Sequence, residues 1–198
     1  QRQQSADLRQ CEAGLLRLAN EAKPPDIRIP RNRYVVDYEG ADEGAVYEAL
    51  SAPPVVAVDR RYTLDQVRYS PQLRARMRSV DIDTINFDTG SFTVTPDQAQ
   101  RLSTIAAAIN QAVKANPQEV FLIEGHTDTV GADAMNLALS DRRAESVALA
   151  LTEFFGVPPE NMVVQGYGEQ FLLVPTDGAE RENRRVAVRR ITDLLEQQ

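Results

Sequence analysis

Residues 120–147 read VFLIEGHTDTVGADAMNLALSDRRAESV. The first four residues, 120–123, form an apolar, β-prone run with the length of a buried strand. The chain then turns polar, and Gly131, Ala132 and Asp133 supply a hinge and a candidate helix N-cap. Residues at helical spacing follow as far as Gly156, a typical helix C-terminus. The stretch therefore predicts a strand, a polar loop and a long helix.

One side of the predicted helix carries polar residues. Asn136, Ser140 and Arg143 recur at steps of four and three, so they lie along one stripe. Asp128 comes just past the strand end, where the helix can aim Arg143 back at it. An acid and an arginine so placed suit a zwitterionic ligand, with Asp128 binding an ammonium and Arg143 binding a carboxylate. The alternative is a structural salt bridge between the two side chains, which at a surface contributes only about 0–1 kcal/mol.

Further elements surround this unit. Apolar residues alternate imperfectly over residues 80–87, which predicts a strand, and Thr95, Pro96 and Gln98 have the pattern of a helix start. Residues 162–164 and 186–188 predict two more strands, and a short tail helix is expected through residues 194–195. The order β-α-β-α-β-β, with crossover helices on one face of a mixed sheet, indicates an α/β (α+β) two-layer sandwich.

The N-terminal part is predicted to form separate units. Residues 1–25 read as a polar helix and linker, and a thin apolar stripe that includes Cys11 ends before Pro24. Residues 26–79 read as a small accessory α+β region, preceding a domain at residues 80–198. Within it, residues 27–29, 34–38 and 55–58 are strand candidates, Asp42 can cap a helix, and residues 63–66 have capping-box spacing.

Six arginines of this accessory region form a local basic patch. A solvated helix face is one interpretation, and contact with an acidic partner or with carboxylates of a glycan strand is the other. The residues are Arg60, Arg61, Arg68, Arg74, Arg76 and Arg78.

Composition excludes several classes of protein. The 198 residues carry a net charge of -7, which argues against nucleic acid as a partner. No apolar run approaches the roughly 20 residues of a transmembrane helix. The first residue, Gln1, indicates a mature or truncated chain, and the single Cys11 cannot form an internal disulfide.

Catalytic and metal motifs are not recognised in the sequence. His126 has no serine or cysteine partner in a nucleophile motif and no HExxH, so it is interpreted as a turn histidine that satisfies backbone hydrogen bonds. Glu124, Asp128 and Asp133 form an acidic cluster in sequence, but their spacing does not match a calcium loop. We therefore expect no enzyme activity, no cofactor and no metal site, and Gly166-x-Gly168 is interpreted as a turn.

Several motifs in order resemble the OmpA C-terminal-like domain family, which includes Pal lipoproteins and MotB-type stators. The resemblance covers roughly residues 80–192. One departure is Ala179-Glu180, where the family often has Gly-Arg, with Arg181 displaced by one position. The matching residues are Gly125-His126-Thr127-Asp128, Gly131, Asn136, Leu139-Ser140, Arg143-Ala144, Gly166-Tyr167-Gly168-Glu169 and Asn183-Arg184-Arg185-Val186.

The resemblance implies non-covalent binding of peptidoglycan through the diaminopimelate of its stem peptide. Asp128 and Arg143 stand at the family's two ligand-gripping positions, and residues 88–90 match the loop that lines the pocket. The expected ligand-binding residues are Asp128, Arg143, Asp88, Thr89, Gly90, Asn136 and Leu139.

The implied setting is the periplasm, with the protein associated with the outer membrane or cell wall. The alternative function is a periplasmic interaction scaffold in which residues 1–79 bind an envelope protein. Of Arg184 and Arg185, at most one is expected to point towards the pocket, because alternation along a strand sends them to opposite faces.

Overall fold

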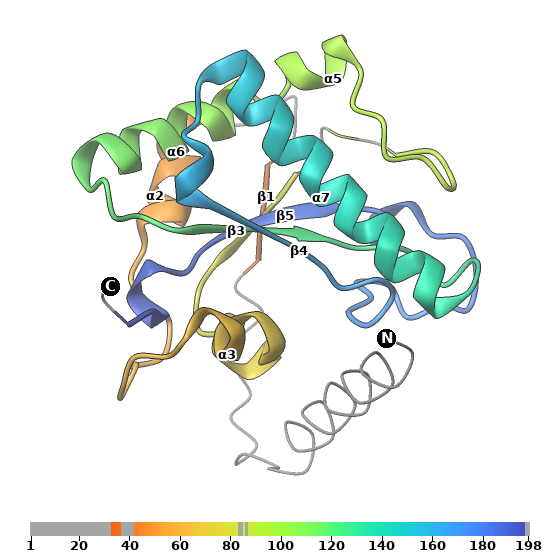
Figure 1. Ribbon diagram of the computed structural model, residues 1–198, viewed down its shortest axis with the longest axis horizontal. Coiled ribbons are helices and arrows are strands. Elements are labelled where there is room, and N and C mark those ends of the chain that lie inside the picture. Colours follow the sequence, from red (N-terminus) through yellow and green to blue (C-terminus); the bar gives the residue numbers. More distant parts are fainter. Residues whose placement is uncertain (1–32, 37–41, 83–84, 86, 197–198) are drawn as a thin grey trace, which may run out of the picture.

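The computed structural model describes residues 33–36, 42–82, 85 and 87–196. The predicted helix and linker at residues 1–25, which include Cys11, and the strand candidate at residues 27–29 lie outside the described residues. Figure 1 shows the described part as one sheet with helices on both of its faces.

The sheet has five strands in the order β1-β2-β5-β3-β4. The antiparallel strand β5 pairs with β2 on one side and β3 on the other, while β1–β2 and β3–β4 are parallel pairs. From β2 to β5 the chain follows the predicted β-α-β-α-β-β order, so the mixed sheet is confirmed. The bounds are β1 Arg33–Val36, β2 Ser79–Ile82, β3 Phe121–Gly125, β4 Met162–Gly166 and β5 Val186–Arg190.

Three helices cover one face of the sheet. Helices α2 (Glu43–Ser51), α6 (Ser103–Ala115) and α7 (Asp133–Phe155) bury apolar residues against the inward positions of the strands, such as Ile123 and Val188. The short helix α5 (Pro96–Gln100) precedes α6 and begins with the predicted cap: the Thr95 and Gln98 side chains complete a capping box. The crossover helices α6 and α7 therefore share one face, as predicted.

The opposite face carries the segment of residues 52–78. Its helices α3 (Leu64–Tyr69) and α4 (Pro71–Arg74) lie on the far side of the sheet from α6 and α7 (Figure 1). Val67 and Met77 pack there against Leu122 of β3 and Ile191. Alternate residues of β3 thus pack into two separate hydrophobic cores. Ile123 packs on the face covered by α2, α6 and α7, and Leu122 packs on the face covered by residues 52–78.

Arginines of this segment contact the sheet and other residues of the segment itself. Arg68 donates from Nη2 to Val164 O of β4 (3.2 Å), and Arg76 donates to Ala57 O (2.9 Å). Arg74 is buried and lies 3.7 Å from a carboxylate oxygen of Glu124 on β3. These three side chains make internal contacts, so the interpretation of the patch as a solvated helix face is wrong for them.

Two elements differ from the sequence prediction. Residues 55–58 form no strand, because no neighbouring strand pairs with them; Val55 N–H instead donates to Arg76 O (2.7 Å). The tail forms a 3-10 helix, Thr192–Leu194, and Leu195 then bridges to Tyr62.

Strand β1 and helix α2 join the sheet and core of the predicted C-terminal domain. The proposed boundary at residue 79 stays a prediction, as does the partner surface proposed for residues 1–79. Among the described residues, no helix has both the length and the apolar character needed to cross a membrane.

Candidate functional site

Two glycines bring helix α7 against the ends of β3 and β4. A Cβ on Gly125 would lie 1.9 Å from Ser140 O, and a Cβ on Gly166 would lie 2.4 Å from Asp141 N. Neither glycine has a positive φ, so close approach of the helix backbone, and not a left-handed conformation, requires glycine here. The contact sets α7 across the strand ends, and its predicted polar stripe of Asn136, Ser140 and Arg143 is buried there.

The helix start differs from the prediction in one detail. Ala132 occupies the N-cap position without a side-chain hydrogen bond, and Asp133 is the first helical residue. An acid in the first turn still interacts favourably with the helix dipole.

Asp128 lies in the loop after β3 and is 4% exposed. Its Oδ2 accepts hydrogen bonds from Arg184 Nη1 (2.7 Å) and Glu180 N (3.3 Å), and its Oδ1 accepts from Val130 N (3.2 Å). Its ion-pair partner among the described residues is thus Arg184 and not Arg143. The structural salt bridge considered between Asp128 and Arg143 is therefore wrong, because the structure pairs this carboxylate directly with Arg184 and not with Arg143.

Arg143 is 1% exposed and is held by three backbone carbonyls. Nε donates to Ser91 O (2.8 Å), Nη2 to Asp88 O (3.1 Å) and Nη1 to His126 O (3.4 Å). Its guanidinium also lies over the ring of Phe87, 5.0 Å from the ring centroid. Burial lowers the pKa of Arg143 to about 10, with Asp128 opposing and Arg184 reinforcing the shift. The side chain therefore remains a cation at neutral pH.

The positive charge of Arg143 has no direct counterion within the described part of the chain. All three of its acceptors are uncharged carbonyls, and no carboxylate there lies within ion-pair distance. A buried cation with only neutral partners is costly unless a ligand completes it, and such groups are enriched at binding sites.

The other predicted ligand-binding residues surround this pair. Asp88, Thr89 and Gly90 are exposed and form a turn closed by Ser91 N–H donating to Asp88 O (2.9 Å), with Gly90 at φ 74°. This turn supplies two of the carbonyls that hold Arg143, and its side chains face solvent.

Asn136 and Leu139 come from helix α7. Asn136 is buried and donates to Asp128 O (3.3 Å) and to Glu169 Oε2 (2.7 Å). Leu139 is half-buried beside it. Asn136 therefore positions the Asp128 loop, and the binding roles of all seven predicted residues stay proposals.

The loop of residues 170–182 closes the site from the other side. Asn183 is fully buried, and its amide accepts from Leu173 N (2.7 Å) and Val174 N (3.0 Å) and donates to Val174 O (2.8 Å). Thr129 Oγ1 donates to Thr176 O (3.1 Å), which joins this loop to the loop that carries Asp128. The start of the loop is the predicted turn, with Gly168 at φ 55°.

Arg184 and Arg185 point in different directions, as predicted. Arg184 binds Asp128, whereas Arg185 Nε lies 3.7 Å from Asp81 Oδ2 on β2. Only Arg184 therefore belongs to the site.

The acidic cluster read from the sequence is separated in the structure. Glu124 faces the opposite side of the sheet, where Arg189 Nε donates to it at 2.7 Å, while Asp133 is exposed at the start of α7. Burial acts to raise the pKa of Glu124, but the charges of Arg189 and Arg74 hold that pKa below its usual range. Within the described residues, no group of three or more His, Cys, Asp and Glu side chains could hold a metal ion.

His126 is a buried turn residue next to this network. Its backbone N–H donates to Arg185 O (2.9 Å), as the sequence interpretation expects, and its ring stacks on Tyr167 with centroids 5.7 Å apart. Neither ring nitrogen has a hydrogen-bond partner. Burial and the charge of Arg185 lower the pKa of His126 to about 4, so the ring is neutral at neutral pH.

Sequence reasoning missed two contacts of the site. The pairing of Arg184 with Asp128 joins residues far apart in the chain, and the contact of Glu169 with Asn136 joins the last loop to α7. The only available signal was the motif positions of Arg184 and Glu169, and motifs do not identify which side chains meet.

The sequence model of the OmpA family matches residues 86–185, about half of the chain. The chain belongs to the OmpA family. The matched span begins just before Phe87 and ends at Arg185, so it contains every residue described above for the Asp128–Arg143 site.

Two lipoproteins are among the relatives of this OmpA-family chain. The outer-membrane lipoprotein YfiB of Pseudomonas aeruginosa is 39% identical over 95 residues, which cover 47% of this chain and 54% of that protein. The putative lipoprotein YfiB of Escherichia coli is 32% identical over 108 residues, covering 54% of this chain and 65% of that protein. The chain thus spans between about half and two thirds of the length of these relatives.

Solved structures with similarity include two envelope proteins. The peptidoglycan-associated lipoprotein from Burkholderia pseudomallei has 32% identity and a TM-score of 0.43, covering 59% of this chain and 92% of that one. The periplasmic domain of Helicobacter pylori MotB has 18% identity and a TM-score of 0.47, covering 57% of this chain and 73% of that one.

Proposed function

We propose that this protein binds peptidoglycan without catalysis, through the diaminopimelate of a stem peptide. Asp128 binds the ammonium and Arg143 binds the carboxylate at the free end of that residue. The observation that carries the proposal is the buried Arg143 guanidinium, which only neutral carbonyls hold and which has no carboxylate partner among the described residues. A ligand carboxylate would supply the missing negative charge.

Both side chains retain hydrogen-bonding capacity. A guanidinium has five N–H donors, and three are in use, which leaves one on Nη1 and one on Nη2 for an end-on carboxylate. A carboxylate has about four acceptor positions, and Asp128 uses two on Oδ2 and one on Oδ1. The remaining position on Oδ1 is where an ammonium binds in this proposal.

Access to Arg143 requires movement of the turn at residues 88–91. Arg143 is only 1% exposed, and Asp88 O and Ser91 O of that turn cover it. Because Asp88, Thr89 and Gly90 are exposed, the turn can shift without opening the core. The ligand carboxylate replaces part of the carbonyl contact as the turn moves.

Binding of this kind anchors an envelope protein to the cell wall. Membership of the OmpA family supports this role, as do relatives named as outer-membrane or putative lipoproteins. We therefore assign the protein to the periplasmic side of the envelope, at the outer membrane or cell wall. Neither a cofactor nor a catalytic group enters this mechanism.

Co-sedimentation with purified peptidoglycan sacculi tests the proposal. The wild-type protein is expected to sediment with the sacculi, and Asp128→Ala and Arg143→Ala to remain in solution. Removing one partner of a buried charge pair costs about 2–5 kcal/mol, a loss of at least 30-fold in affinity. Glu153→Ala and Lys114→Ala, which remove exposed charges, are matched controls that should sediment normally.

Circular dichroism establishes that each variant is folded before its binding is compared. Normal sedimentation of a folded Asp128→Ala protein would contradict the proposal. So would a wild-type protein that stays in solution.

A further inference from the structure

A second stripe of side chains runs along α7 beside the buried one. Met135, Leu139 and Arg142 recur at steps of four and three. Each directly precedes, in the sequence, one residue of the buried stripe formed by Asn136, Ser140 and Arg143. Successive helical residues differ in direction by about 100°, so this second stripe flanks the buried one. It is the more exposed of the two: Met135 is 71% exposed, Leu139 is half-buried and Arg142 is exposed.

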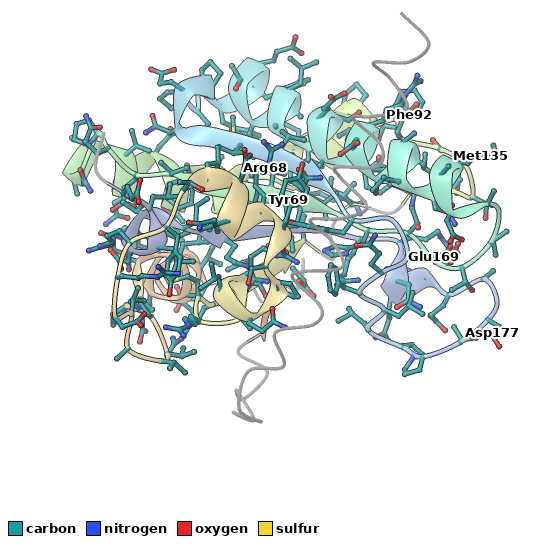
Figure 2. The ribbon with its side chains drawn as sticks, turned by 60° about the horizontal axis from the view of Figure 1, so that its bottom comes forward. Arg68, Tyr69, Phe92, Met135, Glu169 and Asp177 are labelled. Atoms are coloured by element: carbon teal, nitrogen blue, oxygen red, sulfur yellow. The ribbon has the colours of Figure 1, made fainter. Side chains whose placement is uncertain are left out.

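Phe92 meets this stripe from the loop that covers Arg143. The guanidinium of Arg142 lies over the Phe92 ring, 5.2 Å from its centroid, which is within the roughly 6 Å of a cation–π contact. Phe92 directly follows Ser91, whose carbonyl accepts from Arg143 Nε at 2.8 Å. Figure 2 shows Phe92 and Met135 on the side of the molecule where α7 runs. The Arg142–Phe92 pair therefore forms the rim of the Asp128–Arg143 site.

The guanidinium of Arg142 is available for a ligand. Within the described part of the chain its contact is the Phe92 ring, and no acidic side chain pairs with it. Stacking on a ring occupies the face of the guanidinium and leaves the N–H groups at its edge free. The stacked side chain is also partly ordered before binding, which reduces the entropy lost when an anion is bound.

We propose that Arg142, stacked on Phe92, binds a second carboxylate of the stem peptide clamped by Asp128 and Arg143. The inference rests on the proposed function, since the ligand must already be seated in the buried site. The second carboxylate is the free α-carboxylate of the γ-linked glutamate that precedes diaminopimelate in the stem peptide. Arg142 thereby reads the amidation state of that glutamate, which the buried pair does not contact.

A double-mutant cycle between protein and ligand tests this subsite. The probes are the tripeptide Ala-γ-Glu-diaminopimelate and the same tripeptide with its glutamate α-carboxyl group amidated. Isothermal titration calorimetry gives the affinity of each probe for wild type and for Arg142→Gln. Exposed ion pairs contribute up to about 1 kcal/mol, so amidation is expected to weaken binding to wild type about threefold to fivefold. Arg142→Gln should weaken binding of the acid tripeptide equally and be insensitive to amidation.

Arg78→Gln is the matched control, because Arg78 is exposed and lies away from the site. It directly precedes Ser79 of β2, which pairs with Arg189 of β5. The site lies at the other end of β5, where Val186 pairs with Gly125. Its affinities should equal those of wild type. Equal loss on amidation in wild type and Arg142→Gln would overturn the subsite while leaving the buried clamp intact. If wild type binds neither tripeptide, the proposed function and the subsite both fail.

Discussion

The close contact between Gly125 and α7 makes a sharp prediction for Gly125→Ala. The added Cβ would lie 1.9 Å from Ser140 O, and real Cβ contacts essentially never fall below 3.0 Å. The helix or the strand must therefore move by at least about 1 Å, since backbone atoms cannot rotate away. Overpacking of this kind costs about 1–3 kcal/mol, and a backbone clash should reach about 3 kcal/mol.

The movement should also disturb the site. Ser140 Oγ accepts a hydrogen bond from Gly168 N at 2.8 Å, and Arg143 follows Ser140 by one helical turn. For a chain of this size, a loss of about 3 kcal/mol lowers Tm by roughly 6–12 °C. Thermal unfolding followed by circular dichroism measures this shift.

Gly178→Ala is the matched control for the same substitution. A Cβ there would meet only Thr176 Oγ1, at an ordinary 3.9 Å. Its Tm should be unchanged or slightly raised, because alanine restricts the unfolded chain. If Gly125→Ala unfolds within about 1 °C of wild type, the account of how α7 is set against the strand end is refuted.

Two further predictions concern buried titratable groups behind the sheet. Glu124→Gln leaves the guanidiniums of Arg189 and Arg74 without their carboxylate, and the free energy of unfolding should fall by about 3–5 kcal/mol in urea titrations; a loss below about 1 kcal/mol would contradict this. His126 has a folded-state pKa of about 4 against an ordinary 6.5, so its neutral form stabilises the fold fully above pH 6.5. As pH falls from 6.5 towards 4, the unfolded chain binds a proton that the folded chain does not, and up to about 3 kcal/mol is lost. Urea titrations at several pH values measure that slope, and an equal slope in His126→Asn would show that another group causes it.

Periodicity and capping predicted the parts of the fold that local sequence determines. The spacing of Asn136, Ser140 and Arg143 gave the buried stripe of α7, and the Thr95–Gln98 capping box gave the helix start. These features are local because a helix repeats every 3.6 residues and a cap joins residues three apart.

The placement of residues 52–78 could not be read in the same way. Arg68 joins that segment to β4 through the backbone carbonyl of Val164, Arg76 binds the carbonyl of Ala57 within the segment, and carbonyls are present at every residue. A sequence pattern therefore identifies the arginines but not their acceptors, so it predicts a basic patch that either faces solvent or contacts a partner.

The partner of Asp128 was hidden for a related reason. Arg143 and Arg184 are both candidates by residue type, and helical spacing favoured Arg143 because its direction could be derived. Arg184 lies two residues before β5, and only the fold brings its guanidinium to 2.7 Å from the Asp128 carboxylate. The site consequently has two cations and one acid at its centre, where the sequence suggested one of each.

In the proposed function, the buried pair of Asp128 and Arg143 recognises both charges at the free end of diaminopimelate. The most direct measurement is calorimetric titration of the unmodified wild-type protein with three tripeptides of the form Ala-γ-Glu-X, where X is meso-diaminopimelate, lysine or 2-aminopimelate. Lysine lacks the distal carboxylate that Arg143 would bind, and 2-aminopimelate lacks the distal ammonium that Asp128 would bind. Because a hydrogen bond to a charged group is worth about 1.5–3 kcal/mol, each analogue should bind at least about tenfold more weakly than the diaminopimelate peptide. Equal affinity for all three peptides would contradict recognition of the two distal charges by Asp128 and Arg143.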